Sequence, residues 1–498
     1  MKNSILLTVL AIVAVSQLTL AQSHLYKKVP IDPDGPYKRV YNPENIPKEN
    51  DIKGFPSEFT MSFKNAQHNV AYETSTDAPK WLNDGVSWKF KEARAWPLDD
   101  DNVFGSEVGG ASRGLATMTQ YYGNALNVAA VDGVIYAESD DMFAYALNAK
   151  TGKLIWRTSP VGNNLMGTPL IKNDKVYLNA GGVSFTFGQT VKYANNPDKS
   201  ERGAGVSYNG IIALDKKTGE FQWFFATTGE TMTTPAYHDG IIYLATGGGE
   251  VYAINATTGE KIWMKHTGGM ANMANPVYHD GKLYVSMAVS DYVFCMDAKD
   301  GNILWKGQMP GATNTSMGDV TPAIDEGILV MNSVINPLPQ DDGSTTMNTR
   351  VRAFDANSGK VLWDQELGRG PKPQSFKGGV SMIHNGTVYI GNPTTSKYFA
   401  FDLKTGNKKW EWKVPHDSPA GSGRGPGTMY KGTLYISTGA YVYALNPDSG
   451  QLINSVKVGG NFPILSPTIV GGTMYLGNNY DWIIALPVKE VNPNFKMD

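Results

Sequence analysis

The sequence of 498 residues contains a single cysteine, Cys295. One cysteine cannot form a disulfide within the chain, and no C-x-x-C-H motif for covalent haem attachment is present. Lys and Arg number 44 against 46 Asp and Glu, so there is no basic surplus of the kind that binds nucleic acid. We therefore expect no disulfide framework, no attached haem and no nucleic-acid partner. Cys295 is interpreted as a small buried strand residue.

Long hydrophobic runs are also missing, except near the N-terminus. Lys2 precedes a mostly apolar stretch at 5–20, which is shorter than the roughly 20 residues of a membrane-spanning helix. Thr19 and Ala21 are small residues at the positions that precede cleavage of a secretory signal peptide, and no Cys follows for a lipid anchor. We predict a signal peptide at 1–21, cleaved after Ala21, no membrane span, and a periplasmic or extracellular protein.

One motif recurs through the rest of the chain. It consists of an apolar strand, Ala-x-[Asp/Asn], two residues, [Thr/Ser/Asp]-Gly, three residues and Trp. Asp or Asn before Thr-Gly is typical of a tight hairpin turn, in which Gly takes a positive φ and the Asx side chain bonds the local backbone. The Trp at a fixed offset predicts a large apolar plate between neighbouring repeats. The six copies read ALNAKTGKLIW (146–156), ALDKKTGEFQW (213–223), AINATTGEKIW (253–263), CMDAKDGNILW (295–305), AFDANSGKVLW (353–363) and AFDLKTGNKKW (400–410).

A second signature lies between the copies: Pro, two or three residues, Asp-Gly, then apolar-Tyr-apolar, as in TPAYHDGIIYL (234–244). Two hairpins per repeat predict the four-stranded blade of a β-propeller. A seventh copy has Asn454 in place of Trp, and an eighth begins at Ile483 before the chain ends. We predict that a strand at 85–90, which contains Trp88, completes the eighth blade so that no long sheet edge stays open.

The predicted fold is an all-β, eight-bladed β-propeller over residues 66–490, with an N-terminal extension at 22–65 and a C-terminal tail at 491–498. Successive Trp residues lie about 42 residues apart, as expected for propeller repeats. The interval rises to 67 residues before Trp223 and to 58 before Trp363. The extra residues lie at about 182–209 and 332–350, in stretches rich in Gly, Asn, Pro and Asp. We expect two long insertion loops there, and such loops tend to carry function.

The repeat resembles the blade motif of the pyrroloquinoline quinone (PQQ) propeller superfamily, over roughly residues 66–490. Three branches of that superfamily compete. PQQ-dependent alcohol dehydrogenases carry two adjacent cysteines over the cofactor, which a chain with one Cys cannot supply. Scaffold propellers of outer-membrane assembly are lipid-anchored and shorter. The chain is most similar to the third branch, the tetrathionate hydrolases of acidophilic sulfur oxidisers, in length, signal peptide, lack of haem and the two insertions.

This resemblance implies hydrolysis of tetrathionate to thiosulfate, sulfate and sulfur, with an aspartate acting as the acid and without a cofactor. It also implies a secreted protein of an acidophile that forms a homodimer through its insertion loops. A non-catalytic binding scaffold and a PQQ-dependent dehydrogenase with an unusual site remain the alternatives.

Aligning the eight inner strands on the second signature defines a ring of residues around the expected central channel. The position three residues before the Pro is occupied, in blade order, by Ala125, Met166, Met232, Met273, Asp319, Gly378, Arg424 and Ile464. The ring is apolar and rich in sulfur, apart from one acid and one base.

Asp319 is the candidate catalytic acid, because apolar surroundings raise the pKa of a carboxyl group and keep a proton available for the leaving group. Arg424 is the candidate anion-binding residue, since a guanidinium matches a pair of sulfonate oxygens and its flanking glycines let backbone approach a ligand. Met166, Met232 and Met273 supply polarizable thioethers suited to a chain of sulfur atoms. The competing interpretation is an Asp319–Arg424 ion pair, with methionines that only pack.

Asp325 is the fallback acid, because the resemblance implies an essential aspartate in this stretch without fixing its register. It aligns with His238, His279 and His384 of other turns, so its alternative interpretation is a turn residue at the far rim. These His residues fall on separate blades, and the sequence has no zinc spacing, phosphate loop or Ser-His-Asp arrangement. We expect no metal and no cofactor.

Overall fold

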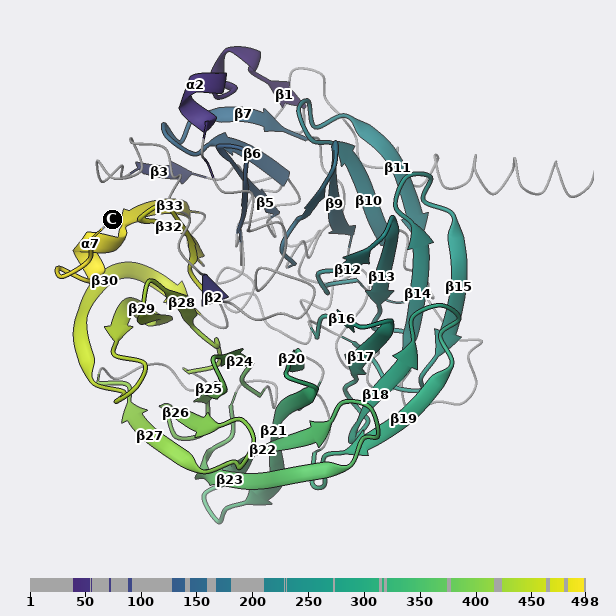
Figure 1. The fold of residues 1–498 in the computed structure, drawn as a ribbon, viewed down its shortest axis with the longest axis vertical. Helices are drawn as coiled ribbons and strands as arrows, with labels where there is room; N and C mark the ends of the chain where they lie inside the picture. Colours follow the sequence, from purple (N-terminus) through teal and green to yellow (C-terminus); the bar gives the residue numbers. More distant parts are fainter. Residues whose placement is uncertain are drawn as a thin grey trace, which may run out of the picture.

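The computed structural model shows a ring of eight sheets, and Figure 1 places β12, β16, β20, β24 and β28 nearest to its centre. This confirms the predicted all-β, eight-bladed propeller. The predicted signal peptide, most of the N-terminal extension and the insertion at 182–209 lie outside the described residues. The structure describes residues 39–53, 55, 71–72, 88–91, 128–138, 144–158, 167–180, 210–227, 229, 231–271, 274–312, 316–317, 320–373, 378–415, 423–462, 466–478 and 482–496.

The strands follow the chain blade by blade. Within each blade they are given in order from the centre outwards. Blade 1 contains β4 (Val128–Val131), β5 (Val134–Glu138), β6 (Ala144–Asn148) and β7 (Leu154–Arg157). Blade 2 contains β8 (Leu170–Lys172), β9 (Lys175–Ala180), β10 (Gly210–Asp215) and β11 (Phe221–Ala226). Blade 3 contains β12 (Ala236–His238), β13 (Ile241–Ala245), β14 (Glu250–Asn255) and β15 (Lys261–His266). Blade 4 contains β16 (Val277–His279), β17 (Lys282–Ser286), β18 (Tyr292–Asp297) and β19 (Ile303–Gln308).

The second half of the ring repeats this order. Blade 5 contains β20 (Ala323–Asp325), β21 (Ile328–Pro339), β22 (Thr345–Asp355) and β23 (Val361–Pro371). Blade 6 contains β24 (Ser381–His384), β25 (Thr387–Asn392), β26 (Lys397–Asp402) and β27 (Lys408–Lys413). Blade 7 contains β28 (Thr428–Tyr430), β29 (Thr433–Leu445) and β30 (Leu452–Phe462). Blade 8 contains β31 (Thr468–Val470), β32 (Thr473–Asn478) and β33 (Trp482–Pro487).

The repeated motif forms the turn between the third and fourth strands, as predicted. In blade 3 the side chain of Asn255 accepts hydrogen bonds from the backbone N–H groups of Thr257 (2.9 Å) and Thr258 (3.0 Å). The N–H of Gly259 donates to the Asn255 carbonyl over 2.8 Å, and Gly259 has φ +74°. A side chain at that φ is strained, which explains the glycine of the motif.

The repeated Trp packs against the turn glycine of the next blade. A Cβ atom added to that glycine would lie 2.5–2.7 Å from the ring. The indole N–H of Trp156 donates to the Lys216 carbonyl (3.0 Å), and the hydroxyl of Tyr136 reaches the same carbonyl (3.4 Å). The motif therefore joins each blade to the next, which confirms the predicted apolar plate. The pairs are Trp88–Gly152, Trp156–Gly219, Trp223–Gly259, Trp263–Gly301, Trp305–Gly359, Trp363–Gly406 and Trp410–Gly450.

The ring closes with a strand from the N-terminal part of the chain. Strand β3 (Trp88–Lys91) pairs antiparallel with β33, with Trp88 opposite Ala485. The indole N–H of Trp88 donates to the Ala149 carbonyl of blade 1 over 2.9 Å. The predicted completion of the eighth blade is thus confirmed, and Trp88 supplies the missing plate.

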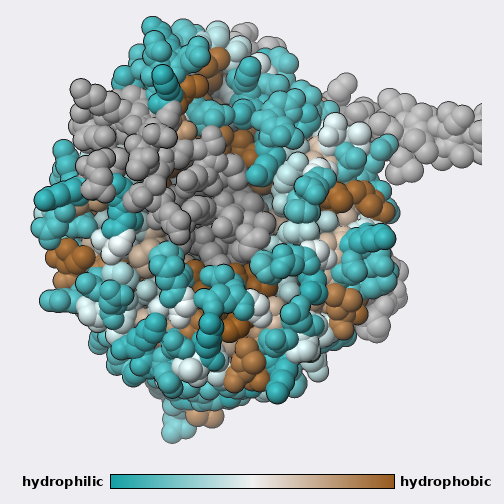
Figure 2. Space-filling model, in the orientation of Figure 1, coloured by the Kyte–Doolittle hydropathy of each residue, from teal (hydrophilic) through white to brown (hydrophobic). Residues whose placement is uncertain are grey.

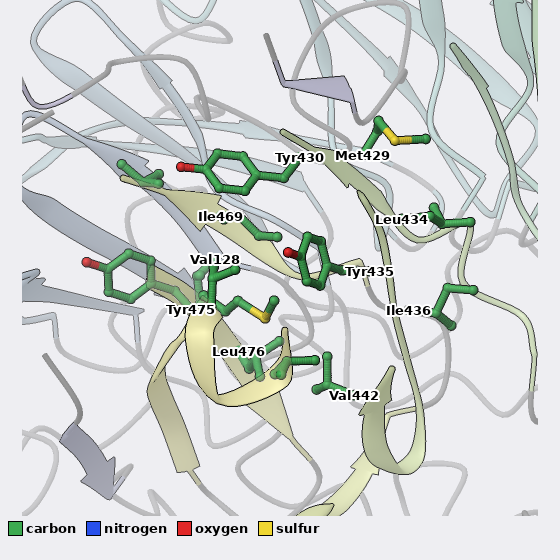
Figure 3. Close-up of a cluster of buried hydrophobic side chains, with 14 of the residues drawn as sticks. Val128, Met429, Tyr430, Leu434, Tyr435, Ile436, Val442, Ile469, Tyr475 and Leu476 are labelled. Atoms are coloured by element: carbon green, nitrogen blue, oxygen red, sulfur yellow. The ribbon is translucent and has the colours of Figure 1, made fainter. Parts of the chain in front are cut away.

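The contact between blades 7 and 8 is built differently, because Asn454 replaces the Trp. A short helix, α7 (Val488–Val491), follows β33, and Val488 and Val491 are fully buried. The side chain of Asn492 donates to the Tyr435 hydroxyl over 3.2 Å. Figure 3 shows the aromatic and aliphatic side chains of the cluster that these blades share with blade 1. Val491 and Asn492, at the start of the segment predicted as a tail, are therefore buried against the propeller.

Two N-terminal segments attach to the propeller at opposite edges of blades. Strand β1 (Val40–Tyr41) pairs with β7 at the outer edge of blade 1, and a 3-10 helix η1 (Pro43–Asn45) and α2 (Glu49–Ile52) follow it. The side chain of Ile52 packs against Gly133 in a turn of blade 1. Strand β2 (Ala71–Tyr72) instead pairs parallel with β28, on the side of blade 7 nearest the centre (Figure 1).

The antiparallel strand order gives the propeller two different sides. The tight turns after the first and third strands lie on one side, here called the turn side. The connections after the second strands and between blades lie on the other, the loop side. The described ring residues, Met232, Gly378 and Arg424, precede the first strands of their blades and so belong to the loop side. β9 ends and β10 begins on this side as well.

The 332–350 insertion also lies on the loop side, but the prediction that it is an irregular loop is wrong. β21 and β22 continue through it as a long hairpin, and β23 is extended beside them. Arg350 pairs with Glu366 (Nη2–Oε1 2.6 Å), and Arg352 pairs with Asp364. Pro and Asp-Gly in the segment suggested a loop, yet they fall at the hairpin tip and its turn.

The described surface is mostly hydrophilic, with hydrophobic residues in separate places at the perimeter and also nearer the middle of the face (Figure 2). Exposed apolar side chains on the outermost strands of blades are Phe221, Ile262, Met264, Ile303, Leu304, Val361, Leu362 and Ile453. Within the described residues, no helix has the length and apolar character needed to cross a membrane.

Candidate functional site

Three of the predicted ring residues are described: Met232, Gly378 and Arg424. Met232 is buried and belongs to the same hydrophobic cluster as Val380 and Met382 of blade 6. The remaining ring positions, namely Ala125, Met166, Met273, Asp319 and Ile464, lie outside the described residues. The geometry of the site is therefore built from the described residues that flank them.

A circumferential series of hydrogen bonds fixes where the inner strands of blades 2 to 5 begin. The N–H of Thr168 donates to the Thr234 hydroxyl (2.9 Å), and the N–H of Thr234 donates to the Asn275 side chain (2.7 Å). The N–H of Asn275 in turn donates to the Thr321 hydroxyl (3.0 Å). All four residues are buried, two positions after a ring residue. These bonds link the starts of the inner strands of neighbouring blades.

Between blades 6 and 7, Arg424 forms the hydrogen bonds that correspond to this series. Val380 occupies the position of Thr321 in blade 6, and its N–H donates to the Arg424 carbonyl over 2.8 Å. The Nε–H of Arg424 donates to the carbonyl of Gly378 over 3.0 Å. Arg424 is only 9% exposed. The structure thus places the positive charge of the ring in a buried position against the backbone of the neighbouring ring residue.

Gly378 in turn lies against the residues that flank Asp319. A Cβ atom added at Gly378 would lie 2.7 Å from Cγ2 of Val320 and 3.3 Å from the carbonyl oxygen of Ser316. The same Cβ would lie 3.3 Å from Oδ1 of Asn332 in β21. Gly378 therefore lies between the Arg424 side chain and the described chain neighbours of Asp319.

The glycine next to Arg424 has a different role from the predicted one. The sequence suggested that glycines here let backbone approach a ligand. The carbonyl of Gly423 instead packs against Gly391 of blade 6, and its N–H donates to the Thr438 hydroxyl (2.9 Å). Gly423 and Gly391 thus let two blades come close, which a side chain at Gly391 would prevent.

The sequence analysis missed a layer of residues at the ends of the second strands, on the loop side. Its members stand two positions after the Tyr of the second signature, or after Val330 in blade 5. We call this set the strand-end layer, and it consists of Glu138, Asn179, Ala245, Ser286, Asn332, Gly391, Ser437 and Gly477. The available signal was a polar residue at a fixed offset from Tyr in four of the eight blades, and at the same offset from Val330 in blade 5.

Glu138 and Asn179 show how this layer bridges blades. The carboxylate of Glu138 in blade 1 accepts hydrogen bonds from the backbone N–H (3.1 Å) and the side chain (3.3 Å) of Asn179 in blade 2. Both residues are fully buried and pack against Gly167, which follows the ring position Met166. In blade 4 the hydroxyl of Ser286 donates to the Val320 carbonyl of blade 5. Polar members of the layer thus contact the segments that carry the ring.

Asp325, the fallback acid, lies at the other end of its strand. It is the last residue of β20 and pairs with Ile328 across a two-residue turn. It is partly buried, and its Oδ1 accepts a hydrogen bond from the N–H of Glu326 (2.9 Å). His238 and His279 occupy the matching turns, where the His238 ring stacks on Tyr278 at 4.1 Å. The structure therefore places Asp325 on the turn side and does not bring it together with Arg424.

Comparison with known proteins agrees with this architecture. A family model for outer membrane protein assembly factor BamB matches residues 83–265, 208–338 and 347–418. Over 490 residues the chain is 49% identical to a tetrathionate hydrolase of Acidithiobacillus ferrooxidans, covering 98% of this chain and 97% of that protein. The chain belongs to the tetrathionate hydrolase family.

A second tetrathionate hydrolase, from Acidianus ambivalens, is 34% identical over 485 residues, covering 92% of this chain and 88% of that protein. Among solved structures, the quinohemoprotein alcohol dehydrogenase of Comamonas testosteroni superposes with a TM-score of 0.57 at 13% identity, covering 94% of this chain and 84% of that one. The latter likeness concerns the fold alone.

In this member of the tetrathionate hydrolase family, Cys295 is a packing residue, as expected from the sequence. It lies in β18 between Tyr284 and Trp305 on the adjacent strands and is fully buried. Burial raises the pKa of its thiol to about 12, so the thiol stays protonated and is a poor nucleophile. The described part of the chain holds no group of three or more His, Cys, Asp or Glu side chains placed to bind a metal ion.

Proposed function

We propose that this protein hydrolyses tetrathionate on the loop side of the propeller, with Asp319 as the general acid. The relationship to two tetrathionate hydrolases over nearly the whole chain supports the reaction. The observation that supports this location is the contact of Gly378 with the neighbours of Asp319, together with the hydrogen bond from Arg424 to the Gly378 carbonyl. Ser316 and Val320 of blade 5, Gly378 of blade 6 and Arg424 of blade 7 thus adjoin, which supports a site at this junction.

The reaction balances with water as the only co-reactant. The oxygen of water bonds to one of the two central sulfurs, and the S–S bond breaks with its electron pair on the leaving thiosulfate. Asp319 protonates that leaving group and recovers a proton from the attacking water, in the manner of a general acid. The remaining HO–S–SO3⁻ fragment breaks down to sulfur, sulfate and a proton. The protein would need no metal or cofactor for these steps.

Arg424 binds a terminal sulfonate group in this proposal, because a guanidinium offers a planar set of donors to anionic oxygens. Met232, with Met166 and Met273, contacts the central sulfurs through polarizable thioethers. Burial strengthens these electrostatic contacts, since a buried site has a lower effective dielectric than water.

The relationship to the tetrathionate hydrolases also bears on where the enzyme acts and how it assembles. We propose that residues 1–21 direct secretion, so that the enzyme acts outside the inner membrane of an acidophile. We also propose a homodimer through the insertions. The hairpin of β21 and β22 supports this role, since it projects as ordered structure and leaves Leu338 53% exposed.

The test measures consumption of tetrathionate by the purified mature protein at about pH 3, where many carboxyl groups of ordinary pKa are protonated. Asp319→Asn removes the proton donor with little change of shape, and we expect its kcat to fall by about 10²- to 10⁴-fold. Asp325→Asn is the matched control, and its kcat should equal that of the wild type. A wild-type protein without turnover refutes the hydrolase, whereas loss of activity in Asp325→Asn alone identifies Asp325 as the acid.

A further inference from the structure

The strand-end layer contains one amide that is fully buried and has no partner. Neither Oδ1 nor Nδ2 of Asn332 forms a hydrogen bond with any residue that the structure describes. Asn332 is 0% exposed. A buried amide without partners costs folding free energy, so such a residue requires an explanation. One explanation is a ligand that completes the hydrogen bonds of the amide when it binds.

Other polar members of the layer form hydrogen bonds through their side chains, although Oδ1 of Asn179 also has no partner among the described residues. Glu138 accepts two hydrogen bonds from the next blade, and Ser286 donates to the next blade through its hydroxyl. Asn332 has the same place in its strand, so its side chain also faces the next blade, which is blade 6. There it meets Gly378, a ring residue without a side chain that could bond the amide.

The position of Gly378 links Asn332 to the proposed site. Oδ1 of Asn332 lies 3.3 Å from where a Cβ of Gly378 would stand, and the Gly378 carbonyl accepts the hydrogen bond from Arg424. Val320 and Ser316, on either side of Asp319, contact the same glycine. The unpartnered amide, the buried guanidinium and the segment of the proposed acid therefore meet around one residue.

We propose that Asn332 is a substrate-binding residue, whose Nδ2–H donates a hydrogen bond to an oxygen of a terminal sulfonate group of the substrate. This inference rests on the proposed function and deepens it. An amide donor distinguishes a chain of sulfur atoms that ends in a sulfonate from an uncapped sulfur chain or an organic disulfide. A hydrogen bond to a charged oxygen is stronger than one between neutral groups, so binding satisfies the amide only when such a ligand is present.

Asn332→Leu tests the proposal, because leucine keeps the approximate volume and removes both polar atoms. We expect the KM for tetrathionate to rise about tenfold or more, as for loss of a hydrogen bond to a charged group. The Tm should stay the same or rise, since an unsatisfied amide has been removed. The dissociation constant of tetrathionate can be measured without turnover in Asp319→Asn and in the double variant Asp319→Asn/Asn332→Leu. We expect the dissociation constant of the double variant to be higher by the same factor as the KM.

Asn392→Leu is the matched control. Asn392 is equally buried, but its Oδ1 accepts from the Thr349 hydroxyl (2.8 Å) and its Nδ2 donates to the Leu367 carbonyl (3.2 Å). The same substitution there should lower the Tm and leave the KM unchanged. If Asn332→Leu lowers the Tm as much as Asn392→Leu does, Asn332 is a structural residue and the proposal is overturned.

The outcomes separate this inference from the function on which it rests. A wild-type protein that neither binds nor consumes tetrathionate removes the proposed function. A wild-type protein that consumes tetrathionate, with an Asn332→Leu variant of equal KM and equal affinity, overturns the role of Asn332 alone. Should Asn332→Leu fail to fold, Asn332→Ser replaces it, and the same rise in KM is expected because serine is too short to reach the sulfonate.

Discussion

The turn side and the loop side of this propeller are formed by the same strands but differ in how strictly they repeat. On the turn side, seven Trp–Gly contacts join successive described blades, and a carbonyl such as that of Lys216 serves both a Trp and a Tyr of the preceding blade. On the loop side, the ring positions that are described hold a methionine, a glycine and an arginine. The repeated residues thus hold the eight blades together. The loop-side positions that do not follow the repeat are available for binding and catalysis.

The contact between blades 7 and 8 supports the same interpretation. Asn454 breaks the repeat there, and the chain compensates with α7 and with Asn492, which bonds Tyr435. The packing function is restored by different residues. On the loop side, by contrast, Arg424 replaces the repeated Thr or Asn contact with hydrogen bonds to the backbone of blade 6, and Asn332 forms no side-chain hydrogen bond with any described residue. Loss of a repeated residue on the turn side should therefore affect stability, and loss of a unique residue on the loop side should affect binding or turnover.

The largest effect on stability is expected from Trp156→Ala on the turn side. Trp156 is fully buried and its N–H is bonded to the Lys216 carbonyl, so truncation should lower the free energy of unfolding by about 3–5 kcal/mol. Urea denaturation measures this loss. The kcat of the folded variant should match that of the wild type; a variant with normal stability and low kcat contradicts the division between the two sides.

Arg424→Ala and Arg424→Lys test the loop side. We expect the KM of the alanine variant to rise about 10- to 100-fold, because a charged hydrogen-bond donor to the sulfonate is lost. Lysine restores the charge without the planar donor set, so its KM should fall between the two. Steady-state kinetics with tetrathionate checks the order. Equal KM values in all three proteins would show that Arg424 only holds Gly378.

Gly378→Ala should disturb stability and activity together. Its new Cβ would lie 2.7 Å from Cγ2 of Val320, so the segment of Asp319 must move, at a cost of about 1–3 kcal/mol. We expect a lower Tm and a reduced kcat. Gly240→Ala is the control on the turn side, where φ is +77° and no atom stands within 4 Å of an added Cβ. That variant should lose stability through backbone strain and keep its kcat.

The smallest effect concerns Glu411 on the outer strand of blade 6. Lys408 and Lys397 hold the pKa of Glu411 at about 2, below its ordinary value of 4.5. Because the pKa of Glu411 is lowered in the folded state, its carboxylate adds to the free energy of unfolding above pH 4.5. That contribution is lost as the pH falls through about 2. Because the pair is partly exposed, the change should be small. Glu411→Gln should flatten the fall of Tm between pH 4 and pH 2 slightly, while a steeper fall would contradict this assignment.

The sequence was most informative where residues repeat. The Asx–Thr-Gly–Trp spacing predicted the blades, the turns and the closing strand at Trp88, because each copy obeys the same local physics of turn and packing. It was less informative where a single segment departs from the repeat. The segment that forms the hairpin of β21 and β22 was predicted as a loop from its Gly, Asn, Pro and Asp content, whereas the structure shows an alternation of buried residues along β22.

The candidate site was predictable only in part. The alignment of inner strands found Arg424 and Gly378, whose contact the structure shows. Strand β2 beside β28 could not be foreseen, because two residues of parallel pairing leave no periodic signal. Asn332 was missed because its environment is set by Gly378, which is distant in sequence and belongs to another blade.

A crystal structure of Asp319→Asn soaked with tetrathionate tests the central claim most directly, since that variant should bind the substrate without cleaving it. The account predicts electron density for the sulfur chain on the loop side, with one sulfonate group in contact with Arg424 and Nδ2 of Asn332. Density beside Asp325 on the turn side, with none near Arg424, would contradict it.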